Sequence, residues 1–373
     1  MTQLEYNFIQ LIRLAMGIPC EELKDIDWDG TWKLACRNHM ETIIQSTMKY
    51  FDDMPEDIVA ISSREANKML ARTMLQEQCL AKVEKALTEA GIHYGLQKGA
   101  ILRNDYPKKY LRFMSDLDFY IKPEERKKIR KVMNEIGIAY FDTESGDDQF
   151  SVAGGGGIEF HGRLLYRRQK NGIENYSCWE YVDEKKNRLT EEGFALNLIG
   201  HVVYDLSKGG PGLRYVLDLW VYQNRRKMQP DWSKVEERLK KDGIYEAAMN
   251  LINLSECLFG KAEKTPLLED MADYVLQGGA YVGGKRNVVS EIALAGNSWR
   301  WFWRHLLRNR NEYENRYPWL KGKPFLFPIA WFHRIVHSMK NHKKEIKKWN
   351  KNQHAPTKKE IREQREFLSK LGI

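Results

Sequence analysis

The segment Arg112-Phe113-Met114-Ser115-Asp116-Leu117-Asp118-Phe119 carries the strongest signal in this chain of 373 residues. Asp116 and Asp118 stand two residues apart, and apolar residues alternate with them. Side chains of a β-strand alternate between its two faces, so the pattern predicts a strand with both carboxylates on one face. Mg²⁺ prefers oxygen ligands and is commonly held by one or two carboxylates together with substrate phosphates. The segment therefore indicates phosphoryl or nucleotidyl chemistry that depends on a metal.

The overall composition is that of a soluble globular protein of two or three domains. Hydrophobic residues make up 42% of the chain and charged residues 30%. Residues 1–17 have no basic region before their apolar residues, which argues against a signal peptide. No apolar stretch reaches the roughly 20 residues that span a bilayer. The five cysteines are scattered without a Cys-x-x-Cys pair, so we expect no disulfides, no zinc site and a cytoplasmic location.

Positive charge is concentrated near the C-terminal end of the sequence. The chain has 60 Lys and Arg against 51 Asp and Glu, which gives a net charge of +9. Residues 321–373 hold 14 of the basic residues and 4 of the acidic ones, so the rest of the chain is nearly neutral. We interpret the tail as a solvated basic helix. Contact with nucleic acid or with an anionic surface is the alternative interpretation.

Around the Asp116–Asp118 segment, the sequence predicts an α+β architecture with a small mixed sheet. Helical spacing of apolar residues predicts a long helix over 65–90 that stops at Gly91. Short alternating runs separated by a helix over 123–135 predict the mixed-sheet core. The prediction divides the chain into an N-terminal helical segment (1–90), an α/β core (91–188), a C-terminal helical domain (189–340) and a basic helical tail (341–373).

A third carboxylate stands in the alternating run Ile158-Glu159-Phe160-His161. Glu159 and His161 would share one strand face, and His161 is interpreted as a structural histidine at least as readily as a catalytic one. If this strand lies beside the Asp116–Asp118 strand, three carboxylates converge on one metal-binding corner.

Two further pairs of charged or titratable residues lie in the predicted C-terminal helices. His201 and Asp205 are spaced i,i+4, and so are Arg214 and Asp218. Residues at this spacing are neighbours on a helix surface. We interpret the Arg214–Asp218 pair as an ion pair rather than a substrate contact.

Taken in order, these motifs resemble the DNA polymerase β-type nucleotidyltransferase superfamily. Its signature is a small-residue turn that opens a helix, a strand with Asp-x-Asp or Asp-x-Glu, and a later strand with a single carboxylate. The corresponding parts here look like Lys98-Gly99-Ala100, Asp116-Leu117-Asp118 and Glu159. Within the superfamily, the chain most resembles the bacterial uncharacterised nucleotidyltransferase family over residues 30–225. The further matches to that family's pattern are Tyr106-Pro107, Arg112, Glu159-Phe160-His161, His201, Gly212-Leu213-Arg214-Tyr215 and Asp218.

The resemblance implies transfer of a nucleoside monophosphate from an NTP, such as ATP, to an acceptor hydroxyl or phosphate. It implies that Asp116, Asp118 and Glu159 are the catalytic residues and hold Mg²⁺ or Mn²⁺. The nucleotide-binding candidates that it implies are Lys98, Gly99, Ala100, Arg112 and Ser115.

The chain departs from the superfamily pattern at two positions. The turn is Gly99-Ala100 where Gly-Ser or Gly-Gly is usual, so a serine hydroxyl is missing, and the third acid is Glu159 rather than an aspartate. An inactive nucleotide-binding regulatory protein is therefore an alternative. A nucleic-acid or membrane-surface module that uses the basic tail is another. The acceptor cannot be read from the sequence, because acceptor pockets are built from dispersed residues.

Overall fold

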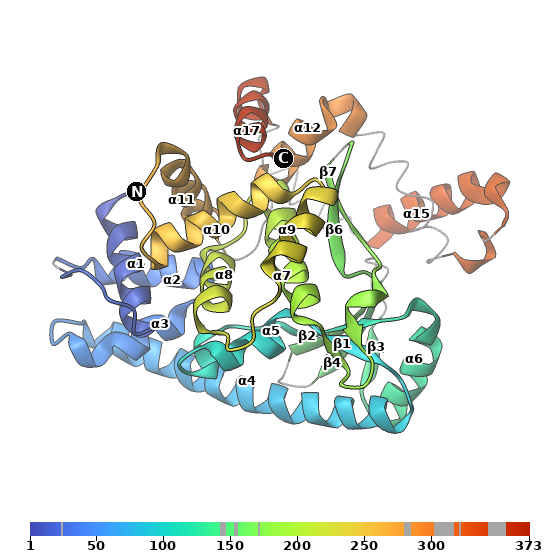
Figure 1. Ribbon diagram of the computed structural model, residues 1–373, viewed down its shortest axis with the longest axis horizontal. Coiled ribbons are helices and arrows are strands. Elements are labelled where there is room, and N and C mark those ends of the chain that lie inside the picture. Colours follow the sequence, from blue (N-terminus) through green and yellow to red (C-terminus); the bar gives the residue numbers. More distant parts are fainter. Residues whose placement is uncertain are drawn as a thin grey trace.

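A computed structural model describes residues 1–23, 25–141, 147–152, 156–170, 172–279, 285–301, 317–320, 322–341 and 356–373. Within these residues, a seven-stranded mixed sheet in the order β3-β4-β5-β2-β1-β9-β8 lies among helices (Figure 1). The strands are β1 (Tyr94–Leu96), β2 (Asp116–Ile121), β3 (Ala139–Phe141), β4 (Asp148–Val152), β5 (Gly156–His161), β8 (Val182–Asp183) and β9 (Arg188–Leu189). Helical segments precede and follow the sheet in the chain, so the predicted α+β class is confirmed.

One face of the sheet is covered by α4 (Glu56–Glu89) and α6 (Arg126–Glu135), as Figure 1 shows along its lower side. The apolar side chains of β2 and β5 pack there against Val83 and Leu87 of α4 and against Ile129 of α6. α4 has 34 residues and begins nine residues before the predicted start. It ends next to Gly91, whose φ of +62° allows the chain to leave the helix as predicted.

The helices at the two ends of the chain share one hydrophobic core. Phe8 and Ile12 of the first helix belong to the same buried cluster as Val202, Val216 and Leu251 of later helices. The N-terminal members are α1 (Gln3–Ala15), α2 (Trp28–Asn38) and α3 (Glu41–Thr47). The later members are α7 (Glu191–Ser207), α8 (Leu213–Arg225), α9 (Trp232–Lys241), α10 (Tyr245–Phe259) and α11 (Pro266–Gly278). The helices before the sheet are therefore packed against the helices that follow it.

Short elements complete the region between the turn and the first carboxylate strand. The one-turn helix α5 (Lys98–Leu102) follows β1, and two 3₁₀ turns (Arg103–Asp105 and Lys109–Leu111) lead into β2. β1 runs antiparallel to β2, while β5 runs parallel to it. This arrangement sets the α5 turn at the end of β2 that carries the carboxylates.

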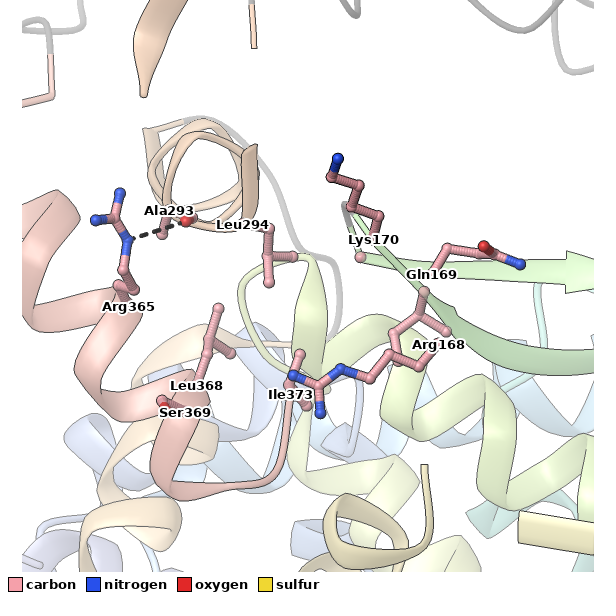
Figure 2. A pocket seen from close by; sticks show the side chains of 11 residues that line it. Arg168, Gln169, Lys170, Ala293, Leu294, Arg365, Leu368, Ser369 and Ile373 are labelled. Carbon is pink, nitrogen blue, oxygen red and sulfur yellow. Dashed lines mark hydrogen bonds between the residues drawn. The ribbon is translucent and has the colours of Figure 1, made fainter. Parts of the chain in front are cut away.

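A two-stranded hairpin that the sequence did not indicate stands apart from the main sheet. It consists of β6 (Leu165–Gln169) and β7 (Gly172–Tyr176). With α12 (Lys285–Ala295) and α17 (Lys358–Lys370), the hairpin borders a pocket of about 220 Å³ (Figure 2). Arg365 of α17 donates a hydrogen bond across it to the carbonyl of Ala293. This pocket involves neither carboxylate strand.

The last described helices are α12, α15 (Phe327–Asn341) and α17. Of the predicted basic tail, 342–355 lie outside the described residues, and α17 lies in its last part. None of the helices in the described ranges combines the length and the apolar character that a membrane crossing requires.

Candidate active site

Two neighbouring parallel strands bring the predicted carboxylates together. β2 and β5 pair so that Asp118 lies opposite Glu159 and Asp116 lies opposite Gly157. The intervening apolar residues, such as Phe119 and Phe160, are buried on the other face. The predicted adjacency of the two strands is confirmed. It follows from the alternation, because both strands bury their apolar residues on the same side of the sheet.

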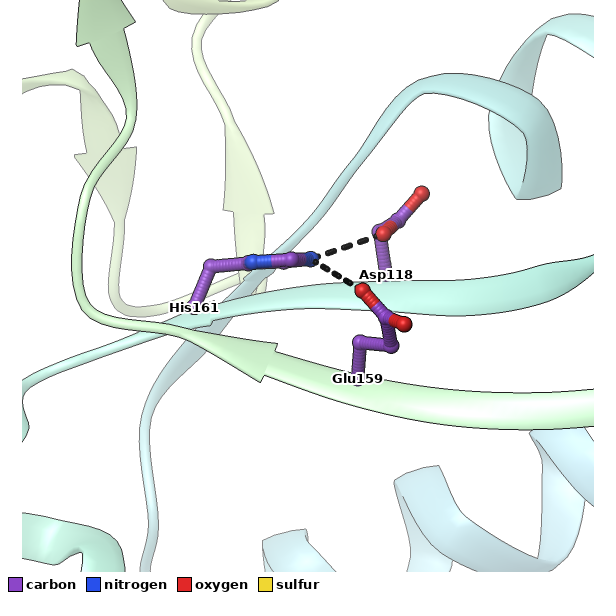
Figure 3. A group of neighbouring side chains, drawn as sticks. All are labelled: Asp118, Glu159 and His161. Carbon is purple, nitrogen blue, oxygen red and sulfur yellow. Dashed lines mark hydrogen bonds and ion pairs between the residues drawn. The ribbon is translucent and has the colours of Figure 1, made fainter. Parts of the chain in front are cut away.

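His161 stands between two of these carboxylates, and Figure 3 shows the three side chains pointing toward one another. Its Nε2 lies 2.8 Å from Asp118 Oδ1 and 3.5 Å from Glu159 Oε2. Its Nδ1 lies 3.2 Å from Asp147 Oδ2. One ligand atom each from Asp118, Glu159 and His161 falls within 4.8 Å of the others, so this group could ligate a metal ion.

Asp116 lies on the same face of β2, two residues before Asp118. Its Oδ1 accepts a hydrogen bond of 2.9 Å from Ser115 Oγ. Glu159 Oε1 accepts one of 2.6 Å from Gln149 Nε2, which fixes the direction of that carboxylate. The predicted ligand set and the geometric group share two carboxylates. The structure adds His161, whose place beside them follows from its position two residues after Glu159 on one strand face.

Burial and neighbouring charge give the carboxylates different proton affinities. Burial raises the pKa of Glu159 to about 7, and the Asp116 carboxylate adds to that rise. Burial and then Asp118 raise the pKa of Asp116. Burial also opposes the charge on Asp118, but Lys98 and His161 hold its pKa below the usual range. Burial likewise disfavours the charged form of His161, whose hydrogen bonds to two carboxylates nevertheless raise its pKa to about 10.

The turn Lys98-Gly99-Ala100 places a cation at the same corner. Lys98 has a φ of +37°, a backbone conformation that few non-glycine residues adopt and that often marks functional sites. Its Nζ lies 3.9 Å from Asp118 Oδ2. The methyl group of Ala100 is buried in the core shared by the sheet, α4 and α6. The side chain at position 100 therefore faces the protein interior.

Arg112, a predicted phosphate contact, lies in a buried ion pair next to the Gly99 turn. Its Nε and Nη2 donate to the two oxygens of Asp218 at 2.9 and 2.7 Å. The Tyr106 hydroxyl donates to the same carboxylate at 2.6 Å. A Cβ on Gly99 would stand 2.3 Å from Arg112 Nη1, so only glycine fits there without displacing the pair. The Arg112 guanidinium thus packs against the Gly99 turn from the protein interior.

The predicted ion pair between Arg214 and Asp218 is wrong. Asp218 is fully buried and its two oxygens are taken by Arg112 and Tyr106, while Arg214 donates to the carbonyl of Phe113. Burial explains the difference, because a buried carboxylate is best stabilised by a bidentate guanidinium. The other spaced pair is present, with His201 Nδ1 3.3 Å from Asp205 Oδ2.

Two arginines from outside the sheet flank the ring of Phe113, and we call this group the Phe113 cluster: Arg72, Phe113 and Arg214. The guanidinium carbons of Arg72 on α4 and Arg214 on α8 lie 5.3 and 5.5 Å from the ring centroid. Arg72 Nη2 donates a 3.0 Å hydrogen bond to the carbonyl of Ser115, the residue before Asp116. Both Nε atoms are buried without a hydrogen-bond partner, and no carboxylate pairs with either guanidinium in the described part of the chain. No local motif surrounds Arg72, so sequence reasoning did not identify it. Arg214 was visible in the family-like motif.

The carboxylate corner, with a lysine at the adjoining turn, is suited to a divalent metal and a polyphosphate. The model of the family described as "Uncharacterised nucleotidyltransferase" matches residues 24–260. The chain belongs to this family, as its motifs indicated, and the match supports a general nucleotidyltransferase role. Searches of curated proteins and of solved structures returned no match. The matched range includes the sheet, α4 and α8, and so all the site residues described above.

Proposed function

We propose that this protein transfers a nucleoside monophosphate from an NTP to an acceptor hydroxyl or phosphate, with a divalent metal as cofactor. The observation that carries the proposal is the register of β2 and β5, which sets Asp118 directly beside Glu159. Lys98, 3.9 Å from Asp118, adds the cation that a polyphosphate needs. Membership of the nucleotidyltransferase family supports the same class of reaction.

The donor set at the corner fits Mg²⁺ or Mn²⁺, because both ions prefer carboxylate oxygens. We assign Asp116, Asp118 and Glu159 as the ligands. Burial and then the neighbouring carboxylate raise the pKa values of Asp116 and Glu159, and a bound cation would favour the charged form of both. His161, hydrogen-bonded on both ring nitrogens, orients Asp118 from the side. A divalent ion bound here would stabilise negative charge on the phosphates and on the attacking oxygen.

We assign the triphosphate to Lys98 and to the two arginines of the Phe113 cluster. Arg214 is only 6% exposed and has no carboxylate partner among the described residues. A buried cation without a counter-ion is costly, and an anionic ligand would offset that cost. Arg72 lies near Asp116, because its Nη2 donates a hydrogen bond to the carbonyl of Ser115, the residue before Asp116. In this assignment Arg112 and Ser115 are positioning residues, since their polar groups already bind Asp218 and Asp116.

The transfer step follows from these positions. The acceptor oxygen attacks the α-phosphorus, the bond from that phosphorus to the bridging oxygen breaks, and pyrophosphate leaves with the bonding electrons. Lys98 and the arginines hold the charge that develops on the leaving group. If the acceptor is a hydroxyl, its proton passes to Glu159, the carboxylate that lies opposite Asp118 on the neighbouring strand.

Calorimetric titration with Mg²⁺ or Mn²⁺ and each of the four NTPs tests binding. Pyrophosphate release over a panel of sugar phosphates, small hydroxyl compounds, proteins and RNA ends tests transfer. We expect at least one NTP to bind and one acceptor to stimulate release, with both activities impaired in Asp116→Asn and normal in the exposed control Asp53→Asn. Absence of NTP binding with either metal, together with an unaffected Asp116→Asn variant, would overturn the proposal.

The alternative function that the sequence suggests is a nucleotide-binding regulatory protein without turnover. The structure adds no support to it, because the side chain at position 100, where the superfamily usually carries a hydroxyl, faces the protein interior. This alternative would be selected by tight NTP binding that depends on Lys98, with no pyrophosphate release for any acceptor in the panel.

A further inference from the structure

The segment around α15 presents an apolar face to solvent. Phe325, Ile329, Phe332 and Val336 are 75%, 60%, 65% and 36% exposed. We call these four residues the α15 stripe. Ile329, Phe332 and Val336 are spaced so that they lie on one side of α15, and Phe325 stands in the 3₁₀ turn (Pro324–Leu326) just before the helix. Trp319, 44% exposed, stands just before them in the chain. Single exposed apolar residues are ordinary, but an aligned set of large ones marks an interaction site.

The opposite side of this helix is packed. Ala330 is fully buried and forms a small core with Tyr317 and Leu320, against which Phe327 and Trp331 also pack. The stripe is therefore the outer face of a folded unit. Figure 1 shows α15 at the right-hand edge, away from the sheet and from the other labelled helices. The stripe thus projects from the periphery of the molecule, where a large flat partner can reach it.

The charge of the surrounding sequence is strongly positive. Residues 321–351 contain nine Lys or Arg and one Glu. Helices that lie in a membrane interface typically combine an aromatic and aliphatic face with many Lys and Arg residues. Basic residues near such a helix add attraction to anionic lipid headgroups. Apolar burial and electrostatic attraction reinforce each other, and stable membrane attachment generally takes two such signals.

We propose that the α15 stripe binds the surface of an anionic membrane, with the helix lying in the plane of the interface, and that the basic residues of the flanking sequence add attraction to the lipid headgroups. Hydrocarbon is the partner that Ile329 and Val336 require, because aliphatic side chains gain nothing from phosphates and cannot stack on bases. This proposal rests on exposure and charge, and it is independent of the proposed function.

Flotation of the full chain with lipid vesicles tests the proposal. We expect binding to phosphatidylcholine vesicles that contain phosphatidylserine, weaker binding at high salt, and little binding to phosphatidylcholine alone. Replacing two stripe residues, Ile329→Ser with Phe332→Ser, should lower the partition coefficient by about tenfold or more. Replacing two charges, Lys321→Gln with Lys323→Gln, should lower it by about thirtyfold.

Matched controls use exposed residues elsewhere on the molecule. Met228→Ser removes an apolar side chain that is 62% exposed, and Lys127→Gln with Lys128→Gln removes two exposed charges on α6. Both should leave vesicle binding unchanged. Circular dichroism melting should be the same for all variants, because every replaced side chain in the stripe is exposed.

Three results would overturn the proposal. One is equal binding of anionic vesicles by the chain and by the stripe variant. Another is the absence of binding to anionic vesicles; a dimer that is seen by sedimentation and lost in the stripe variant would then identify a second copy as the partner. The last is binding to RNA or DNA oligonucleotides without binding to vesicles.

Discussion

The two faces of the β2–β5 pair differ in kind although they are made by alternating residues of the same short segments. On one face, Phe119 and Phe160 are fully buried against the layer of α4 and α6. On the other, Asp118, Glu159 and His161 form a charged cluster. Adjacent residues such as Glu159 and Phe160 thus serve opposite purposes. The comparison teaches that substitutions at adjacent residues of one strand can alter either the stability of the fold or the chemistry of the site.

The largest effect is expected on the apolar face. Phe160→Ala should lower the free energy of unfolding by about 3–5 kcal/mol, because it leaves a cavity among Phe119, Phe150 and α6. Urea denaturation followed by circular dichroism measures this change. Activity per folded molecule should persist at low temperature. A loss below about 1 kcal/mol would contradict the tight packing of this face.

On the charged face, Asp118→Asn should reduce kcat by about 10²–10³-fold. The variant loses charge toward the metal and its ion pairs with Lys98 and His161. Pyrophosphate release under saturating NTP and acceptor measures the effect, and Asp53→Asn is the matched control. Full activity of Asp118→Asn would remove this residue from the proposed site.

Glu159→Gln should separate the two faces most sharply, because it should stabilise the fold while impairing transfer. The pKa of Glu159 in the folded protein is raised from 4.5 to about 7, so the folded state binds more protons in that window. The free energy of unfolding therefore falls as the pH rises from about 4.5 to 7. Above pH 7 the destabilisation by the charged Glu159 is complete. The variant should gain about 1–3 kcal/mol at about pH 8 in metal-free protein, and little at about pH 4.

Urea titrations of both proteins at the two pH values measure the difference. Gln149→Ala provides a second comparison, since it removes the hydrogen bond to Glu159 without changing the charge. Equal stability of chain and Glu159→Gln variant at both pH values would contradict the raised pKa.

The smallest expected effect lies outside both faces, at the Phe113 cluster. Arg72→Gln should raise KM for the NTP by about tenfold with a smaller change in kcat, because it removes one charge-assisted contact to phosphate. Steady-state kinetics with NTP varied at fixed acceptor measure it. Arg64→Gln, an exposed arginine on the same helix, is the control. Identical KM values for the two variants would exclude Arg72 from the triphosphate site.

The carboxylate corner was predictable because its pattern is local. Alternation in two short segments fixes which residues are buried, and burying both apolar sets on one side leaves Asp118 and Glu159 together. The turn at Lys98-Gly99 was predictable from its order in the chain relative to those segments. Helix ends such as Gly91 followed from glycine's access to positive φ.

The supporting contacts were not predictable, because they join distant parts of the chain. Arg72 lies 43 residues from the Ser115 carbonyl that it binds, in the middle of a continuous helix without a motif. Asp218 pairs with Arg112, 106 residues away, although Arg214 stands at ideal helical spacing. Both contacts form on tertiary folding between segments that are distant in sequence. For Asp218, the bidentate hydrogen bonds from Arg112 stabilise the buried carboxylate better than a pair with its helix neighbour Arg214 would. The β6–β7 hairpin was missed because Arg167, Arg168 and Gln169 break the alternation of a half-buried strand.

The buried pair of Arg112 and Asp218 has a consequence for the evolution and dissection of this protein. It joins the loop before β2 to α8, so a fragment limited to residues 91–188 would lose the carboxylate that pairs with Arg112 and the helix that packs over it. Removing one partner of a buried pair costs about 3–5 kcal/mol, a large share of the stability of a small domain. We therefore expect that the sheet with the carboxylates does not fold stably without the flanking helices. The flanking helices and the sheet must be inherited, expressed and exchanged between proteins as one unit.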